Sequence, residues 1–328
     1  MGDKDTLSKR YLSRPDIFAD AFNFYLFGGD RVIQPKDLEE RDTTEVAVVK
    51  KMESIFADQK IRDVLKECII RRSRYATLIL LGIEAQDKVS YVMPVRDNLY
   101  DALNYYSQVD DIGRKHHKAK DLKGSAEFLS GFSKEDRIKP VITLCVCFDK
   151  TKWDGARSLM EMFDDVDPRL RPFINDYKIN LITPGEIKDF SKFSSGLGQA
   201  LEFIEISGDK GAVRDIIYNS RYEAVDEETI DIINTYTNTT IPKKDKNEGK
   251  VNMCKGLQDL IEEFRKEDQI MIDKEKKRAN AMEERLNKEK ERANMAKEQA
   301  KQEMERADKA EAEIKVLRAK LAAVGIEV

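Results

Sequence analysis

Hydrophobic residues in the first part of the chain occur in short, nearly continuous runs in some places and at helical spacing in others. Apolar runs at residues 62–70 and 75–84 are separated by the polar stretch RRSR, and they predict two strands paired as a hairpin. Further runs at residues 140–148 and 177–183 predict a third and a fourth strand. The third run is almost continuously apolar, which is typical of an interior strand covered on both faces.

Helical spacing occurs before, between and after these runs. Residues 16–27 are dense in apolar and aromatic side chains and end at Gly28 and Gly29, so they predict a buried helix. Other predicted helices cover residues 96–109, 190–206, 211–219 and 227–236. The predicted connections are the polar segment 34–60, the basic loop 113–124 and the polar linker 237–250. This order predicts an α/β domain over residues 1–247, with a mixed sheet flanked by helices.

A charged segment with a seven-residue spacing dominates the remainder, residues 248–328. One row of positions is apolar throughout: Ile272, Ala279, Leu286, Ala293, Ala300, Ala307, Ile314 and Leu321. A second row is only partly apolar: Glu275, Met282, Glu289, Ala296, Glu303, Ala310, Leu317 and Val324. The two rows predict a long heptad-repeat helix that forms a homo-oligomeric coiled coil. A single charged helix, stabilised by ion pairs four residues apart, is the alternative.

The composition narrows the possible classes of protein. Hydrophobic residues make up 41% and charged residues 37% of the 328 positions, which is enough for a folded core. The net charge of -4 gives no global basic signature for nucleic acid, but a local basic surface is compatible with it. The N-terminus lacks the apolar core of a signal peptide, and no apolar stretch has the length of a membrane span. We therefore expect a cytoplasmic chain without a membrane partner.

The cysteines have neither metal-site spacing nor a redox motif. Cys145 and Cys147 lie two apart in a predicted strand, so both side chains would face the same side. We expect them, together with Cys68 and Cys254, to be buried free thiols.

Acidic and amide side chains follow the apolar run LILLGI. Glu84 and Gln86 lie two apart at the end of the second predicted strand and would point to the same side. Asp63 lies near the start of the preceding strand, and hairpin pairing would place it beside Glu84. Two close carboxylates repel each other unless a cation lies between them. Mg²⁺, or Mn²⁺, would accept these ligands, with Asp20 on the first predicted helix completing the shell through water.

Six segments occur in an order that resembles one nuclease family. They are DAFNFYLF, RDVLK, LILLGIEAQ, MPVRDNLYDAL, KPVITLCVCFDKTKWDGARSLMEMF and DYKINLIT, within residues 18–206. This order resembles the Rpn family of recombination-promoting nucleases, also labelled putative transposases, in the PD-(D/E)XK nuclease superfamily. The resemblance implies a restriction-endonuclease-like fold and Mg²⁺-dependent hydrolysis of phosphodiester bonds in DNA.

The resemblance also implies a role for each acidic or amide residue. Asp63 and Glu84 would bind the metal ion, and Asp20 would be a supporting acid. Gln86 stands where the wider superfamily has a lysine. It would orient the attacking water or a phosphate oxygen, but it brings no positive charge and cannot act as a base.

Two groups of residues would contact the nucleic acid. Arg96 and Tyr100 are four apart on a predicted helix, so they share a face from which they would reach a phosphate. In the basic segment, Arg114, Lys115, Lys118 and Lys120 would contact the DNA backbone. Adjacent side chains diverge, so His116 and His117 favour a solvated loop over a metal site, and Trp153 is expected to be a packing residue.

A catalytically inactive nuclease-like scaffold or DNA-binding protein, assembled through its coiled coil, is the alternative function. The glutamine at position 86 and the acidic net charge favour it. A transposase is a third possibility, but the sequence shows no separate triad of two aspartates and a glutamate.

Overall fold

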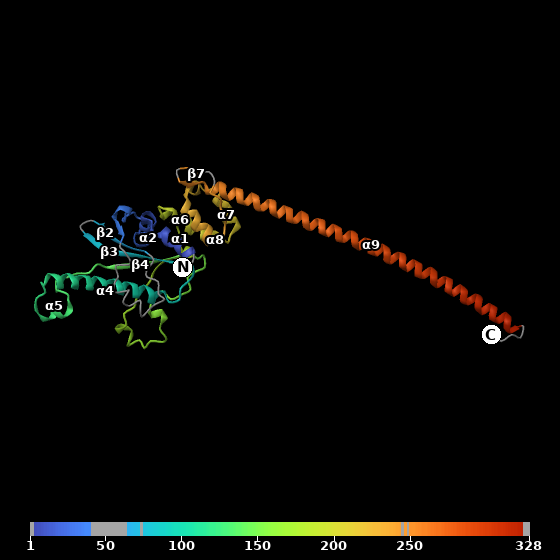
Figure 1. Cartoon of the computed structure of the whole chain (residues 1–328), viewed down its shortest axis with the longest axis horizontal. Helices are drawn as coiled ribbons and strands as arrows, with labels where there is room; N and C mark the ends of the chain where they lie inside the picture. The colour runs from blue at the N-terminus through green and yellow to red at the C-terminus, as the bar shows by residue number, and fades with distance from the viewer. Residues whose placement is uncertain (1–2, 41–63, 73–74, 244–245, 248, 324–328) are drawn as a thin grey trace. The chain divides into compact units, whose positions relative to one another are not determined.

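The computed structural model describes residues 3–40, 64–72, 75–243, 246–247 and 249–323 (Figure 1). Its main sheet has five strands in the order β1-β2-β3-β4-β5. The strands are β1 Leu38–Glu40, β2 Val64–Arg72, β3 Tyr75–Gln86, β4 Val141–Cys147 and β5 Asn180–Ile182. β1, β2 and β3 pair antiparallel, whereas β3, β4 and β5 pair parallel. The predicted mixed sheet is confirmed, with the edge strand β1 as an addition inside the segment predicted to be a connection.

The predicted hairpin is confirmed, and its register positions the residues of interest. Val64 lies opposite Ile83, and Arg72 lies opposite Tyr75. The β2 strand therefore begins beside the carboxyl end of β3, next to Glu84. On the other side of β3, Glu84 pairs with Cys145 and Gln86 with Cys147 in the parallel strand β4.

The helices are α1 Asp3–Ser13, α2 Pro15–Phe27, α4 Met93–Ala119, α5 Gly124–Ser130, α6 Gly196–Ile206, α7 Lys210–Ile216 and α8 Glu227–Thr237. Single turns of 3-10 helix occur at Pro35–Asp37, Met160–Met162, Arg171–Phe173, Pro184–Glu186, Phe190–Lys192 and Ser220–Tyr222. The predicted helix at 190–206 is thus shorter, because the side chain of Ser195 accepts a hydrogen bond from the Leu197 amide and starts α6 there.

The prediction of a basic loop at 113–124 is wrong, because α4 continues through Ala119. Gly113 in that segment does not end the helix. A Cβ atom at this position would lie 3.3 Å from the carbonyl oxygen of Gly131, so the glycine permits a close approach of the chain after α5. The helix ends at Lys120, which has a left-handed backbone with φ of 57°.

The prediction of a polar linker at 237–250 is also wrong. Within it, β7 Lys246–Asn247 and the start of β8 Lys250–Val251 join β6 Val225–Asp226 in a second sheet, ordered β6-β8-β7. Ile241 is 2% exposed, and its amide donates to the side-chain oxygen of Asn234. A single buried isoleucine thus anchors a segment that is otherwise polar.

Different helices cover the two faces of the main sheet (Figure 1). α1, α2, α6 and α8 cover one face, where the largest group of buried apolar residues lies. α4 runs along the other face, packed against β4. A smaller apolar group on this side contains Met93, Cys145, Cys147 and Trp153, so Trp153 is a packing residue as predicted. All four cysteines are buried free thiols, which is also confirmed.

The C-terminal helix α9 Met253–Ala323 is continuous over 71 residues (Figure 1). The chain divides into two compact units, Met1–Leu260 and Ile261–Val328. This division lies later than the predicted boundary after residue 247. In the described part of the chain, no helix combines the length and apolar character needed to cross a membrane.

Candidate functional site

The alternation of side chains along β3 separates two environments. Ile83 is fully buried in the main core, whereas Glu84, the next residue, points to the α4 side of the sheet. Glu84 is 1% exposed. Burial of an ionised carboxylate is unfavourable unless it is paired and hydrogen-bonded, so its surroundings decide what it can do.

Arg96, in the first turn of α4, forms an ion pair with this carboxylate. Its Nη2 lies 3.2 Å from Oε2 of Glu84 and 3.5 Å from the hydroxyl of Tyr100. Burial alone would lower the pKa of the guanidinium, but Tyr100 and Glu84 outweigh this effect and raise the pKa of Arg96 above its ordinary value. The sequence-predicted residues Glu84, Arg96 and Tyr100 are therefore brought together, and the cation stays charged.

A second carboxylate, which sequence reasoning missed, is buried at the same place. Asp97 follows Arg96 on α4 and is 0% exposed. Burial, followed by Asp97, Cys147 and Glu84, raises the pKa of the Cys145 thiol well above its ordinary value. The thiol therefore stays protonated at neutral pH, so the carboxylate oxygens around it, and not its sulfur, are the atoms whose chemistry suits a hard cation.

The polar layer continues one helical turn farther along α4. Asp101 accepts hydrogen bonds from the hydroxyl of Thr143 at 2.5 Å and from that of Tyr177 at 2.8 Å. These contacts connect α4 to β4 and to the segment before β5. Beyond them, Lys139 pairs with Glu67 of β2 at 2.6 Å. Asp97 and Asp101 are four residues apart, so they share one face of the helix. This spacing is the sequence signal that could have predicted the two acids as neighbours.

Gln86 lies at the end of β3, half-buried. Its Nε2 donates to the backbone carbonyl of Ala85 at 2.9 Å. Its own backbone carbonyl accepts from the amide of Phe148 at 2.8 Å. The side-chain oxygen and one amide hydrogen are thus available to orient a water or a phosphate oxygen next to Glu84.

Of the two other predicted acids, one lies outside the described residues and the other lies away from Glu84. Asp63 lies outside the described residues. Asp20 is on α2, which covers the opposite face of the sheet, and is 2% exposed. Its carboxylate accepts four hydrogen bonds, from the backbone amides and hydroxyls of Ser194 and Ser195, at 2.5 to 2.9 Å. Asp20 thereby fixes the chain at the start of α6.

The second predicted DNA-contacting group, that of the basic segment, lies on the last turns of α4 and at Lys120, which caps it. Arg114 is paired with Asp110 at 2.9 Å and with Asp111 at 2.7 Å. Lys115, Lys118 and Lys120 are exposed, and no ion pair within the described residues uses them. Cationic charge for a phosphate backbone is therefore present here mainly as lysine.

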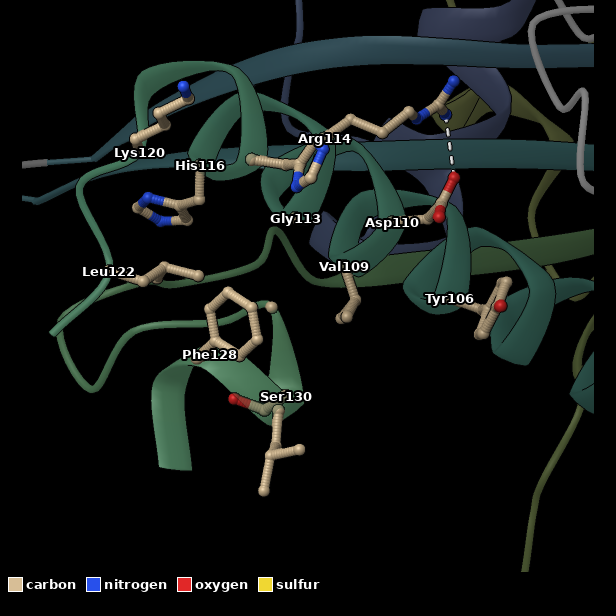
Figure 2. Close-up of a pocket in the computed structure, with 13 residues that line it drawn as sticks. Tyr106, Val109, Asp110, Gly113, Arg114, His116, Lys120, Leu122, Phe128 and Ser130 are labelled. Atoms are coloured by element: carbon tan, nitrogen blue, oxygen red, sulfur yellow. Dashed lines mark ion pairs between the residues drawn. The ribbon is translucent and has the colours of Figure 1, made fainter. Parts of the chain in front are cut away.

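A cavity of about 820 Å³ opens beside these turns, between α4 and α5 (Figure 2). Figure 2 shows Arg114 directed toward Asp110, with His116, Leu122 and Phe128 around the opening. His116 bridges two acids: its Nδ1 lies 2.6 Å from Asp121, and its Nε2 lies 2.8 Å from Asp136. His116 is thus a clamp for the segment that carries α5, rather than a solvated loop residue.

Among the described residues, no three His, Cys, Asp or Glu side chains are grouped so that they could hold a metal ion. The candidate metal ligands among the described residues are the buried carboxylates of Glu84 and Asp97, and carboxylate oxygens are ligands that suit Mg²⁺. The chain was compared with protein families, curated proteins and solved structures, and no match was found in any of them.

Proposed function

We propose that the chain is a Mg²⁺-dependent DNA endonuclease of the recombination-promoting type, with Mn²⁺ as a substitute ion. The observation that carries the proposal is the buried carboxylate of Glu84 at the carboxyl end of an interior strand. The guanidinium of Arg96 on the following helix contacts it, and the hydroxyl of Tyr100 in turn lies 3.5 Å from that guanidinium. A second buried carboxylate, that of Asp97, lies nearby. Buried acids beside a cation and a half-buried amide are typical of catalytic sites.

The architecture supports a restriction-endonuclease-like fold. The antiparallel hairpin β2–β3 is followed by α4 and by the parallel strand β4, with helices on both faces of the sheet. The register places the start of β2 at Val64 opposite Ile83, beside Glu84. Asp63 directly precedes Val64 in the sequence. We therefore assign Asp63, together with Glu84, as a ligand of the same metal ion.

Each residue would have a distinct task in phosphodiester hydrolysis. A bound Mg²⁺ would supply positive charge at the scissile phosphate and lower the pKa of a bound water. Glu84 and Asp63 would hold the ion. Arg96 would neutralise a phosphate oxygen, with Tyr100 orienting its guanidinium, and Gln86 would position the water. Lys115, Lys118 and Lys120, with Arg114, would hold the DNA backbone.

A cation and Arg96 would compete for the same carboxylate. Arg96 contacts Oε2 of Glu84 at 3.2 Å, and a divalent ion on that carboxylate would repel the guanidinium. Binding of the ion would thus release Arg96 toward the phosphate. Replacement of Arg96 by methionine should tighten binding of Mg²⁺ to the free protein while it weakens cleavage.

A non-catalytic scaffold is the second candidate, because the same ion pair also suits a purely structural role. Arg96 neutralises Glu84 within the fold and connects α4 to β3. In that case Glu84 needs no metal ion, and the chain would act through DNA binding or through assembly of α9.

Cleavage of supercoiled plasmid by the purified chain, with Mg²⁺ or Mn²⁺, tests the proposal. Loss of even an outer partner of a metal ligand costs about 10–100-fold in activity, so Glu84→Gln should reduce nicking by at least about 100-fold. Glu202→Gln is the matched control, because Glu202 is also ion-paired, with Arg221 at 2.8 Å, but is on α6, which covers the opposite face of the sheet. Full activity in Glu84→Gln, or none in the wild type with either ion, would reject the endonuclease and favour the scaffold.

A further inference from the structure

The distal part of α9 exposes large apolar side chains in a regular row. Ile314 is 51% exposed, and Leu317, three residues later, is 57% exposed. Farther toward the N-terminus, Leu286 is 51% exposed and Met282 is 75% exposed. A helix gains most of its stability by packing its apolar stripe against another element. Within the described residues of α9 beyond Ile270, nothing covers this stripe.

The apolar character of the row is strongest at its C-terminal end. Ala307, Ala310, Ile314 and Leu317 alternate by three and four residues, so all of them lie on one seam of the helix. Nearer the N-terminus the second row contains Glu275, Glu289 and Glu303, which are unfavourable in a coiled-coil core. A partner helix would therefore bind most strongly to the distal segment, which we define as residues 306–318.

We propose that the distal segment pairs in parallel and in register with the distal segment of a second copy of this chain. The proposal is independent of the proposed nuclease activity. In a parallel pair, the residue that directly precedes a first-row position (Ala307 or Ile314) faces the residue five positions later on the partner helix. In this segment the facing pairs are Arg306 with Glu311 and Glu313 with Arg318. Both pairs have opposite charges, and symmetry forms each of them twice.

The antiparallel arrangement of the same seam is less favourable. With Ile314 opposite Leu317 of the partner, Glu313 would face Lys320, but Arg318 would face the partner's Arg318. The antiparallel pair thus contains one like-charged contact, between the two Arg318 residues, whereas both kinds of facing pair in the parallel arrangement have opposite charges. The segment that has the best apolar seam is therefore also the segment whose charges favour a parallel second copy.

The three glutamates of the second row limit the pairing to the distal end. In a parallel, in-register pair each of them would face its own equivalent, and the two carboxylates would repel each other. Lys290 beside Glu289 and Lys276 beside Glu275 reduce this repulsion, whereas Glu303 is followed by Met304. We expect the two helices to be paired on the C-terminal side of Glu303 and separate on its N-terminal side. The dimer is then joined only at the C-terminal ends of the two copies of α9.

Sedimentation of the full chain over a range of concentrations tests the dimer. Ile314→Lys should raise the dissociation constant of the dimer by at least about 100-fold, because it places like charges in the seam. Val316→Lys is the matched control: Val316 is 55% exposed but lies off the seam, and the dissociation constant should change less than about 3-fold. A wild-type chain that is monomeric throughout, or equal effects of the two variants, would overturn the proposal.

A charge exchange tests the orientation. Glu313→Lys and Arg318→Glu should each weaken the dimer, because each creates like-charged pairs in the parallel arrangement. The double variant restores opposite charges between positions 313 and 318, so its dissociation constant should return to near the wild-type value. In an antiparallel dimer the double variant would place the new lysine at position 313 opposite Lys320 and the two new glutamates at position 318 opposite each other. It would then be about as weak as Glu313→Lys, and Arg318→Glu alone would change little. That result would reject the parallel arrangement.

Discussion

The two faces of the main sheet are built from the same strands but have opposite character. On the face covered by α1, α2, α6 and α8, β3 and β4 contribute Ile79, Leu81, Ile83, Leu144 and Val146, all buried in one core. Lys66 is a buried charged residue of this face, and its ammonium lies 5.5 Å from the centroid of the Phe18 ring. On the face covered by α4, alternate residues of the same strands include Glu84 and Thr143. One face thus stabilises the fold by apolar burial, and the other combines two smaller apolar groups with a layer of polar contacts.

The polar layer has a physical cost that the apolar face avoids. A buried polar group that loses its partner costs about 1–3 kcal/mol, and a buried charge costs more. On the α4 face the described partners are specific: Glu84 has Arg96, and Asp101 has Thr143 and Tyr177. A protein gains no stability from such a layer over a well-packed apolar one. The α4 face therefore contributes to stability according to how completely its polar groups are paired, whereas the other face contributes through apolar burial.

The largest expected effect on stability lies on the apolar face. Ile83→Ala removes a fully buried side chain and should lower the free energy of unfolding by about 2–5 kcal/mol, because transfer and cavity terms add. Ile69→Ala is the same change on β2, where the side chain is 40% exposed, and should cost less than about 1 kcal/mol. Urea denaturation of both variants measures the difference. Equal costs would contradict the assignment of the core to this face.

An intermediate effect is expected on the polar face. Asp101→Ala leaves the hydroxyls of Thr143 and Tyr177 without their acceptor and should lower the free energy of unfolding by about 1–3 kcal/mol. Asp101→Asn retains one acceptor oxygen, so its cost should be smaller. Urea denaturation again gives the values. An alanine variant as stable as the wild type would show that the layer contributes little to folding.

The sequence was sufficient for β2, β3, β4 and β5 and for the β2–β3 hairpin, because apolar runs, β-propensity and the RRSR break all agree there. It also predicted that Glu84 and Gln86 share one side of β3 and that Arg96 and Tyr100 share a helix face. These predictions depend on local periodicity alone. The extent of α4 could not be predicted, because Gly113 is typical of a helix end, whereas its role here is the close approach to Gly131.

The partners of each acid depend on tertiary packing, and the sequence carries little information about them. In the sequence, Asp16 is nearly as good a choice as Asp20 for the supporting acid. In the structure, Asp20 holds Ser194 and Ser195, more than 170 positions away, while Asp16 pairs with Arg14. Asp97 lies on a helix whose local spacing does not indicate whether an aspartate is buried. Only the packing of α4 on β4 reveals that it is buried.

The smallest expected effect is local, at the far end of the helix that covers the polar face. His116 joins the last turn of α4 to Asp121 and Asp136. The hydrogen bonds to Asp121 and Asp136 raise the pKa of His116 above its ordinary value of 6.5. The hydrogen bond from the Ser133 amide and the contact with His116 lower the pKa of Asp136. His116 is protonated and Asp136 is ionised at pH values between the lowered pKa of Asp136 and the raised pKa of His116, so the ion pair is complete in that range.

The sign of the pH dependence follows from these shifts. The contribution of His116 is fully present below pH 6.5 and is lost as the pH rises through the raised pKa of the folded state. Amide exchange in residues 120–136, corrected for its intrinsic pH dependence, should therefore become less protected above that pKa. NMR titration of the His116 ring should give a midpoint above 6.5, and Asp121→Asn should move it back toward 6.5. His117→Asn, which leaves the two bridges in place, should not move it; a midpoint unchanged by Asp121→Asn would contradict the clamp.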